Sequence, residues 1–352
     1  MKRSPPPTSR DVALRAGVSR SIVSGVLNGT MSTMRVSEET RLRILAAAEE
    51  LGYTPNPVAQ ALRRKRSNVL GFVPRSDRLN PYDSPVPFLL AVHLTHAGTA
   101  QGYHFVTANP ETPDHGNTDK LIQFLIGRHV DGIVLDSPPD AAEVAALVER
   151  RIPIVQMIRP QHDVPSPTIM IDARPGTTEA IRHLIEAGHR DIAFIGIAGD
   201  HPVDRSRLDA FREVLAAAQI APREEWTILV RAYNTANGRT AAEALMRCPS
   251  LPTAVFVTGD NLAAGVLQVL YEHGVRVPDQ LSVISYDDIY AGHLAPPLTS
   301  VNQPLQAAAS RAVELLASWI EGGAADGGEW ESVVLPTTLV TRGSVRRIGG
   351  DG

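Results

Sequence analysis

Four residues near the amino terminus, Arg20, Ser21, Ser24 and Gly25, have types and spacing suited to contact with nucleic acid. The Arg20 guanidinium and the serine hydroxyls can donate hydrogen bonds to phosphate oxygens and to base edges. On a helix, positions 20, 21, 24 and 25 share one face, and Val23 lies on the other. The sequence therefore predicts an outward face that contacts a DNA duplex.

Two short helices are expected to position this face. The spacing of Thr8 and Asp11 is that of a capping box and predicts a helix from Ser9 to about Ala16. Ser19 is a typical amino-terminal cap for a second helix, Arg20 to about Asn28, so a short turn joins the pair at an angle. The apolar residues that recur at helical spacing and predict a shared core are Val12, Ala13, Val18, Val23, Val26 and Leu27.

A third helix is expected to complete this small domain, beginning after Ser37 and ending at Gly52. Its predicted apolar stripe is Ile44, Leu45, Ala48 and Leu51. Asn56 then caps a fourth, very short helix, with Pro57 at its first position and the rest from Val58 to about Arg63. A helix of this length is marginal alone, so we expect it to order only when something holds it.

Charge divides the chain between two parts. Residues 1–68 contain twelve Lys or Arg and five Asp or Glu, whereas the whole chain has a net charge of −4. A basic amino-terminal part suits phosphate neutralisation. The lone Cys248 cannot form an internal disulfide, and the sequence has neither a membrane-spanning apolar run nor the apolar core of a signal peptide. We therefore expect a cytoplasmic protein that associates with the nucleoid and not with membranes.

The sequence lacks the common motifs of enzymes. It contains no GxGxxG, Walker or GxSxG motif, and Cys248 has no CxxC partner. His93 and His96 have a spacing that can hold a metal, but no third ligand is evident nearby, so we interpret them as a packed or solvated pair. The sequence therefore predicts no catalytic residue, no metal and no cofactor.

The remainder alternates β-branched runs with helical stretches, a pattern typical of parallel strands joined by crossover helices. The predicted strands are Val69 to Val73, Tyr103 to Thr107, Gly132 to Leu135, Pro153 to Met157, Ile169 to Ile171, Ile192 to Ile195, Thr253 to Val257 and Ser282 to Ser285. The predicted helices include Thr177 to Glu186, Arg205 to Ala218, Thr240 to Arg247, Leu262 to His273 and Gln306 to Ile320.

Five segments carry a family resemblance: DVALRAGVSRSIVSGVLNG, VSEETRLRILAAAEELGYTPNPVAQALR, IEAGHRDIAFIG, VPDQLSVISYDDI and PPLTSVNQP. Through them the chain resembles, over nearly its whole length, the lactose-repressor/galactose-repressor (LacI/GalR) family of bacterial transcription regulators. The resemblance implies an all-α helix-turn-helix headpiece with a hinge helix, followed by an α/β, two-lobed, periplasmic-binding-protein-like (type I) sensor domain of doubly wound parallel sheets.

The resemblance also implies contacts with DNA. The second helix is expected in the major groove and the hinge helices of a dimer in the minor groove, where Leu62 wedges into the central base step. The residues implied at the DNA are Thr8, Ser19, Arg20, Ser21, Ser24, Gly25, Asn28, Asn56, Val58, Ala59 and Leu62. Two departures from the family pattern, Gly25 where relatives commonly carry Arg and a longer segment from Thr30 to Arg35, predict an atypical operator. Leu62 can alternatively be read as a domain-packing residue.

In the sensor domain the resemblance implies a closing cleft for a small molecule. The implied effector residues are Arg159, Arg207, Tyr233, Asp260, Asp287 and Gln303. An arginine fork, a carboxylate and a stacking ring suit a carbohydrate with neighbouring hydroxyls. A nucleoside, a sugar acid and a phosphorylated sugar stay open, because Gly259 replaces a common Asn and the segment Asn80 to Phe88 is altered.

The expected organisation is an arm of residues 1–7, a DNA-binding domain of residues 8–54, a hinge and linker of residues 55–67, a body of residues 68–345 and a tail of residues 346–352. The expected function is that of a transcriptional regulator, by default a repressor, which binds a pseudo-palindromic operator as a homodimer or higher oligomer under the control of an effector. Induction, corepression and activation all stay open. The alternative is a two-lobed sugar-binding protein of a transport system, which would lack a use for the basic headpiece.

Overall fold

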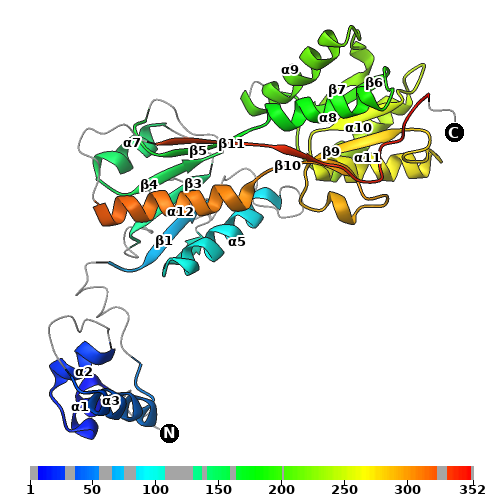
Figure 1. Cartoon of the computed structure of the whole chain (residues 1–352). Coiled ribbons are helices and arrows are strands. Elements are labelled where there is room, and N and C mark those ends of the chain that lie inside the picture. Colours follow the sequence, from blue (N-terminus) through cyan, green and yellow to red (C-terminus); the bar gives the residue numbers. More distant parts are fainter. Residues whose placement is uncertain are drawn as a thin grey trace. The chain divides into compact units, whose positions relative to one another are not determined.

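The computed structural model describes residues 7–27, 36–54, 66–74, 85–107, 130–136, 141–158, 164–199, 202–322 and 331–349. The chain divides into two compact units, Met1–Asn68 and Val69–Gly352 (Figure 1). Predicted features that lie outside the described residues are the arm of residues 1–6, the segment Thr30 to Arg35, most of the hinge, and the site residues Asn28, Asn56, Val58, Ala59, Leu62 and Arg159.

Three helices form the described part of the first unit: α1 (Ser9–Ala16), α2 (Arg20–Leu27) and α3 (Glu38–Leu51). Gly17 and Gly52 end the first and third helices with φ angles of 66° and 63°, in the left-handed region that glycine adopts without a steric penalty. The three predicted helices are therefore confirmed, with ends within about one residue of those expected from the sequence.

The helix caps follow the predicted chemistry. The Asp11 carboxylate accepts hydrogen bonds from the Thr8 backbone N–H and hydroxyl, each at 2.7 Å. These bonds stabilise the charged carboxylate, so they lower the pKa of Asp11 below its ordinary value. At the start of α3, the Ser37 hydroxyl oxygen accepts a bond from the Thr40 N–H at 3.3 Å. Each cap supplies a partner to a helix end that would otherwise lack one.

The core of the first unit departs from the prediction at one position. Its buried residues are Val12, Ala13, Ala16, Val23, Ile44, Ala47 and Ala48, with Val18, Ile22, Val26, Leu27, Leu51 and Tyr53 packed against them. Leu45, expected in the stripe, is instead 38% exposed. Positions 44, 47, 48 and 51 share one face of a helix, whereas position 45 lies about 100° away from 44, so Ala47 belongs to the stripe and Leu45 does not.

The second unit contains two six-stranded sheets, one in each lobe. The strands of the first lobe are β1 (Val69–Val73), β2 (His104–Thr107), β3 (Gly132–Asp136), β4 (Ile154–Met157), β5 (Thr168–Asp172) and β11 (Ser332–Pro336). Those of the second lobe are β6 (Ile192–Ile197), β7 (Thr227–Val230), β8 (Ala254–Val257), β9 (Ser282–Asp287), β10 (Thr299–Asn302) and β12 (Thr338–Val340).

The sheets have the strand orders β11-β5-β4-β3-β1-β2 and β12-β10-β9-β8-β6-β7. Every pair among the described strands is parallel except β10 with β12. Helices cover the sheets: α5 (Pro85–Ala100), α7 (Ala141–Glu149) and α12 (Leu305–Gly322) in the first lobe, and α8 (Arg174–Glu186), α9 (Pro202–Ala217), α10 (Thr235–Met246) and α11 (Asp260–Glu272) in the second (Figure 1). Separate apolar clusters lie on the two faces of each sheet, which makes both lobes doubly wound.

The chain passes between the lobes three times, from β5 to α8, from β10 to α12 and from β11 to β12. Thr337, in the last of these links, connects two of the passages. Its hydroxyl donates to the Asp172 carbonyl at 2.8 Å and accepts from the Gly176 N–H at 3.0 Å. A Cβ at Gly176 would lie 2.5 Å from Val301 Cγ1, so only glycine permits this close approach. The links therefore form a packed junction between the lobes.

All eight predicted strands are confirmed, with each boundary within two residues of its predicted position. The structure adds β7, β10, β11 and β12, which were not predicted from the sequence. Helix α10 begins five residues before its predicted start, because Asn234 caps it by accepting the Asn237 N–H at 2.8 Å. Within the predicted tail of residues 346–352, the Ile348 N–H donates to the Ala187 carbonyl at 2.7 Å, which holds this segment on the second lobe.

Candidate functional site

The outward face predicted for α2 is present in the first unit. Val23 is fully buried and anchors the helix, Arg20 and Ser21 are exposed, and Ser24 and Gly25 are half-buried. This is the pattern expected of a helix that packs on one side and offers polar groups on the other. The structure therefore brings the four predicted contact residues of this helix onto one surface.

The turn before α2 fixes the direction of that face. The Val18 N–H donates to the Ala13 carbonyl at 3.1 Å, and the Ser19 hydroxyl oxygen accepts the Ile22 N–H at 3.4 Å. The Arg20 Nε donates to the Ser9 hydroxyl at 2.9 Å, so the guanidinium lies beside the start of α1. Ser19 and Arg20 thus have structural roles that are compatible with contact to a phosphate backbone.

In the second unit, the predicted effector residues follow strands of the second sheet. Arg207 lies in α9 after β6, Tyr233 follows β7, Asp260 follows β8, Asp287 ends β9 and Gln303 follows β10. Because the carboxyl ends of parallel strands meet at one edge of a sheet, these five residues gather at the edge that faces the first lobe. Arg207 and Gln303, which are far apart in the sequence, therefore lie at the same edge of the sheet.

Arg207 is the buried cation of this edge. Only 5% of its surface is exposed, and its Nη1 donates to the Tyr233 hydroxyl at 2.7 Å and to the Thr258 carbonyl at 3.1 Å. Its guanidinium carbon lies 3.7 Å from the centre of the Tyr286 ring, close enough for a cation–π interaction. Tyr233 in turn donates its hydroxyl hydrogen to Asp204. Arg207 is therefore held from several sides in a fixed orientation.

Asp287 is the half-buried acceptor of the site. It has a φ angle of 98°, in the left-handed region that non-glycine residues rarely adopt. Its Oδ1 accepts a hydrogen bond from the Gln303 Nε2 at 2.6 Å. Desolvation, followed by the nearby Asp260 carboxylate, raises the pKa of Asp287, although Arg207 and Gln303 oppose the shift. A neighbouring hydroxyl can therefore find either a strong acceptor or a protonated donor here.

Asp260 differs from the other predicted effector residues. It is fully buried, and its Oδ2 accepts backbone N–H groups of Ile289, Tyr290 and Ala291 at 2.8, 3.0 and 3.2 Å, while its Oδ1 accepts the Ser285 hydroxyl at 2.8 Å. The carboxylate thus closes the turn that follows Asp287. This geometry favours a supporting role for Asp260, in place of the direct contact with effector expected from the sequence.

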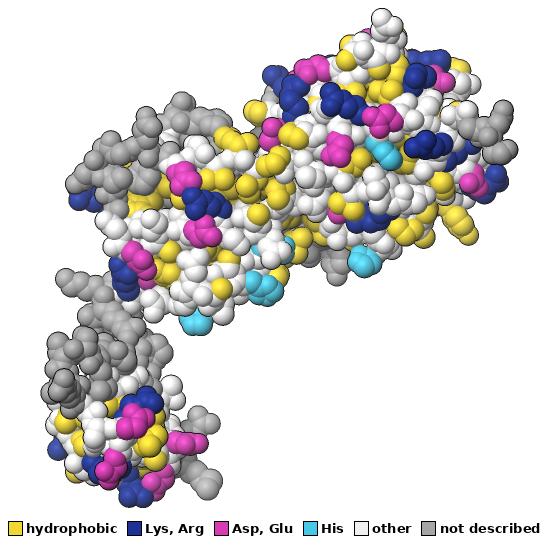
Figure 2. All heavy atoms as spheres, in the orientation of Figure 1, with side chains coloured by type: hydrophobic (Ala, Val, Ile, Leu, Met, Phe, Trp, Pro, Cys, Tyr) yellow, Lys and Arg dark blue, Asp and Glu magenta, His cyan; other side chains and the backbone are white. Residues whose placement is uncertain are grey.

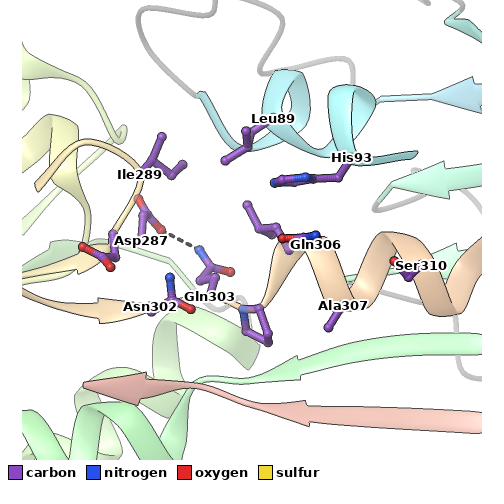
Figure 3. Close-up of a pocket in the computed structure, with 12 residues that line it drawn as sticks. Leu89, His93, Asp287, Ile289, Asn302, Gln303, Gln306, Ala307 and Ser310 are labelled. Atoms are coloured by element: carbon purple, nitrogen blue, oxygen red, sulfur yellow. Dashed lines mark hydrogen bonds between the residues drawn. The ribbon is translucent and has the colours of Figure 1, made fainter. Parts of the chain in front are cut away.

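A cleft of about 580 Å³ lies beside Asp287 and Gln303 (Figure 3). Leu89 and His93 of α5 lie on one side of it, and Gln306 lies near His93 at the start of α12. The remaining described lining residues are Asp288, Ile289, Asn302, Pro304, Leu305, Ala307 and Ser310. The cleft is therefore lined by residues of both lobes, as expected for a site that closes on a ligand.

Burial and the neighbouring His96 lower the pKa of His93, so this ring is predominantly neutral at neutral pH.

Among the described residues, no group of three or more His, Cys, Asp or Glu side chains has the geometry to hold a metal ion. No helix within the described part of the chain is long and apolar enough to cross a membrane.

Two residues of the site were missed from the sequence. Asp204 and Tyr286 surround Arg207, but Asp204 precedes it by one helical turn in an otherwise ordinary amphipathic helix, and Tyr286 reads as a core residue of β9. Gly259, which was noted as a departure from the family, has a structural reason. A Cβ there would lie 2.9 Å from Tyr233 Cδ1 and 3.4 Å from Asp287 Oδ2, so glycine makes room for the tyrosine ring.

Comparison with protein families gives two matches. The family described as "Bacterial regulatory proteins, lacI family" matches residues 8–56, and the family described as "Periplasmic binding protein-like domain" matches residues 181–345. The first contains the α1–α2 pair, and the second contains every described effector candidate.

Several curated relatives align over almost the full chain. The HTH-type transcriptional repressor PurR of Pectobacterium carotovorum is 33% identical over 342 residues, which are 96% of each chain. The HTH-type transcriptional regulator CelR of Thermobifida fusca is 34% identical over 352 residues, covering 98% of this chain and 100% of that one.

Solved structures agree. A Lac repressor dimer bound to operator and the anti-inducer ONPF has a TM-score of 0.79 and 27% identity, covering 97% of this chain and 100% of that one. A CelR–cellobiose complex has a TM-score of 0.68 and 33% identity, with coverage of 96% and 99%. Given this agreement in motif, fold and length, the chain belongs to the LacI family of bacterial transcriptional regulators.

Proposed function

We propose that this regulator is a repressor that binds operator DNA as a homodimer and is controlled by a sugar or sugar derivative. The observation that carries the proposal is the cleft between the two lobes, which Asp287 and Gln303 line, in a chain that also has a DNA-binding unit. The hydrogen-bonded pair Arg207 and Tyr233 lies at the same end of the second sheet. Relatives named as a CelR–cellobiose complex and a ribose operon repressor support a carbohydrate as the ligand class.

In this proposal the α2 faces of two copies contact the two half-sites of a pseudo-palindrome. Arg20, Ser21, Ser24 and Gly25 contact the major groove, and paired hinge helices enter the minor groove with Leu62 as the wedge. Opening the minor groove costs free energy, so operator binding depends on how close together the bodies hold the two hinges. Thr8, Ser19, Asn28, Asn56, Val58 and Ala59 add contacts that position the protein on the duplex.

The homodimer is supported by the surface of α5 as well as by the dimeric Lac repressor. This helix carries no Lys, Arg, Asp or Glu, and Figure 2 shows no such charged side chains over it. Phe88 and Val92 are 40% and 48% exposed. Apolar side chains exposed at adjacent turns of one helix are typical of an interface. We infer that α5 lies at or near the contact between two copies.

Control by the effector follows from the two-lobed body. A ligand that contacts Arg207 and Asp287 from one lobe and α5 from the other favours one degree of lobe closure. Coupling of this kind changes DNA affinity by about 1 to 3 kcal/mol in typical allosteric proteins. Arg159 is proposed as a further ligand contact from its position in the sequence. No chemical conversion of the ligand is proposed, and the site of action is the bacterial cytoplasm, where the chromosome is accessible.

The test is a thermal-shift screen of the full chain against sugars and nucleosides, followed by anisotropy measurements on the promoter DNA beside its gene. We expect Asp287→Ala to abolish the response of DNA binding to any sugar that stabilises the wild type, and to leave binding without sugar within about twofold. Asp279→Ala is the matched control, because Asp279 is exposed and pairs only with the nearby Arg276 at 3.2 Å among described residues. An unchanged dose-response curve in Asp287→Ala contradicts the assignment of the site.

A further inference from the structure

We propose that the ligand of this cleft is an uncharged sugar, and that Asp204 is the positioning residue that makes the site unfavourable to anionic ligands. The inference rests on the proposed function, because it takes the cleft to be the effector site, and it narrows the ligand class. It starts from the electrostatic surroundings of Arg207, which is the natural partner for a carboxylate or a phosphate.

The charge of Arg207 is already balanced from within its own helix. Asp204 lies one turn before it in α9, is 8% exposed, and accepts the hydroxyl hydrogen of Tyr233. The same hydroxyl oxygen accepts the Arg207 Nη1–H at 2.7 Å. Tyr233 thus connects the carboxylate to the guanidinium through two hydrogen bonds. In a buried environment this arrangement stabilises both charges without any contribution from a ligand.

A second carboxylate adds to this balance. Asp287 and Tyr233 lie on either side of the space above Gly259, where a Cβ would be 3.4 Å from Asp287 Oδ2 and 2.9 Å from Tyr233 Cδ1. The carboxylate of Asp287 also lies close enough to Arg207 to favour the protonated, charged form of the Arg207 guanidinium. Arg207 therefore has two carboxyl groups near it, of which Asp287, with its pKa raised to about 7, is only partly charged near neutral pH. An incoming anion would gain less from Arg207 than from an arginine without such neighbours.

The described wall of the cleft, which does not include Arg207, offers no Lys or Arg to an anion. None of its twelve residues is Lys or Arg, and its two acidic residues are Asp287 and Asp288. Asp288 is paired with Arg342 at 2.7 Å, which leaves that arginine committed to it and to the Leu298 carbonyl. The neutral polar groups of the wall, which suit hydroxyls as donors and acceptors, are Asn302, Gln303, Gln306 and Ser310.

Repulsion between like charges is appreciable at a buried site such as this one. Two like charges about 6 Å apart interact by roughly 0.7 kcal/mol in water and several times more strongly in a protein interior. An uncharged polyol avoids that repulsion and can still hydrogen-bond to Asp287, Gln303 and the other neutral polar groups of the wall. The structure therefore favours neutral sugars over uronates and sugar phosphates.

The test uses sugar pairs that differ by one anionic group: glucose with glucuronate, galactose with galacturonate, and ribose with ribose 5-phosphate. Binding to the full-length protein is measured by calorimetry at neutral pH and fixed ionic strength. In each pair that the wild type recognises, we expect the neutral member to bind at least about 100-fold more tightly, which corresponds to about 2.7 kcal/mol. We expect Asp204→Asn to reduce the ratio of neutral-sugar affinity to charged-sugar affinity at least about tenfold.

Asp209→Asn is the control, because this exposed carboxylate lies on the same helix and its removal changes the protein's charge equally. Tyr233→Phe keeps the ring but breaks the link between Asp204 and Arg207, so it should narrow the ratio as Asp204→Asn does. A ratio of affinities is insensitive to a general loss of stability, which separates this role from a merely structural one.

The inference is overturned if a charged member binds the wild type as tightly as its neutral partner, or if Asp204→Asn leaves the ratio unchanged. Either result leaves the proposed control by a sugar intact. If no sugar in any pair binds, neutral or charged, the proposed sugar function fails together with the inference.

Discussion

Replacing Gly265 by alanine should destabilise the second lobe by about 2 to 3 kcal/mol, because α10 and α11 pack with their backbones in contact. A Cβ on Gly265 would lie 2.1 Å from the Thr235 carbonyl oxygen and 2.7 Å from the Arg239 nitrogen. The contact is reciprocal, since a Cβ on Gly238 would lie 2.2 Å from the Leu262 carbonyl oxygen. All of these atoms belong to backbone, which cannot rotate away as a flexible side chain can.

The magnitude follows from the required separation. Ordinary contacts of a Cβ begin at 3.4 Å, so relieving the shortest contact of 2.1 Å moves the helices apart by about 1.3 Å. Overpacking of this kind costs about 1 to 3 kcal/mol, and rigid backbone on both sides places Gly265→Ala at or above the upper end. The better helix propensity of alanine offsets up to about 1 kcal/mol. At roughly 2 to 4 °C per kcal/mol for a domain of this size, the melting temperature should fall by about 4 to 12 °C.

The assay is thermal and urea denaturation of the full chain, with ligand affinity measured in parallel. Tyr233 lies just before Asn234, the cap of α10, and Asp260 begins α11, so separating the helices should also weaken ligand binding. Gly322→Ala is the control, because Gly322 ends α12 and a Cβ there meets no atom of the described residues within 4 Å. A Gly265→Ala protein within about 0.5 kcal/mol of the wild type would refute the argument from backbone contact.

Three further predictions concern DNA binding and pH. Leu62→Ala should weaken binding to a specific operator by about tenfold or more and leave salt-sensitive nonspecific binding nearly unchanged, as measured by anisotropy. Equal losses of specific and nonspecific binding would contradict the assignment of Leu62 to the minor groove. Gly25→Arg should change the base preference in a selection for binding sites, and an unchanged profile would mean that position 25 does not face bases. His189 lies 2.9 Å from the Thr253 hydroxyl and 3.1 Å from the Arg346 carbonyl, and burial lowers its pKa below the ordinary 6.5. The unfolded chain therefore binds a proton more readily than the folded chain, so the stability from this site is present above about pH 6.5 and falls as the pH is lowered. His189→Gln should make the melting temperature depend less on pH in this range. If the melting temperatures of variant and wild type fall equally with pH, His189 is not the group responsible.

The helical headpiece shows how far local sequence determines structure. The caps at Thr8 and Ser37 and the glycines at positions 17 and 52 act through neighbouring backbone groups, so their effects can be read from spacing alone. The same holds for the buried strands, whose continuous apolar runs identify them before their partners are known. The error at Leu45 arose from assigning the adjacent positions 44 and 45 to one stripe, although neighbouring residues of a helix lie about 100° apart around its axis.

The ligand site shows what the sequence alone could not decide. Family motifs placed Arg207, Tyr233, Asp260 and Asp287 near a ligand, but only the packing of the second sheet separates Asp260, whose oxygens are occupied by protein donors, from Asp287 at the cleft. Asp204 gave no signal in the sequence, because its role depends on a hydroxyl 29 residues away along the chain. Helix ends and strand cores are set by interactions between near neighbours, whereas the charge balance around a buried cation depends on which distant carboxylates the fold brings within hydrogen-bonding reach.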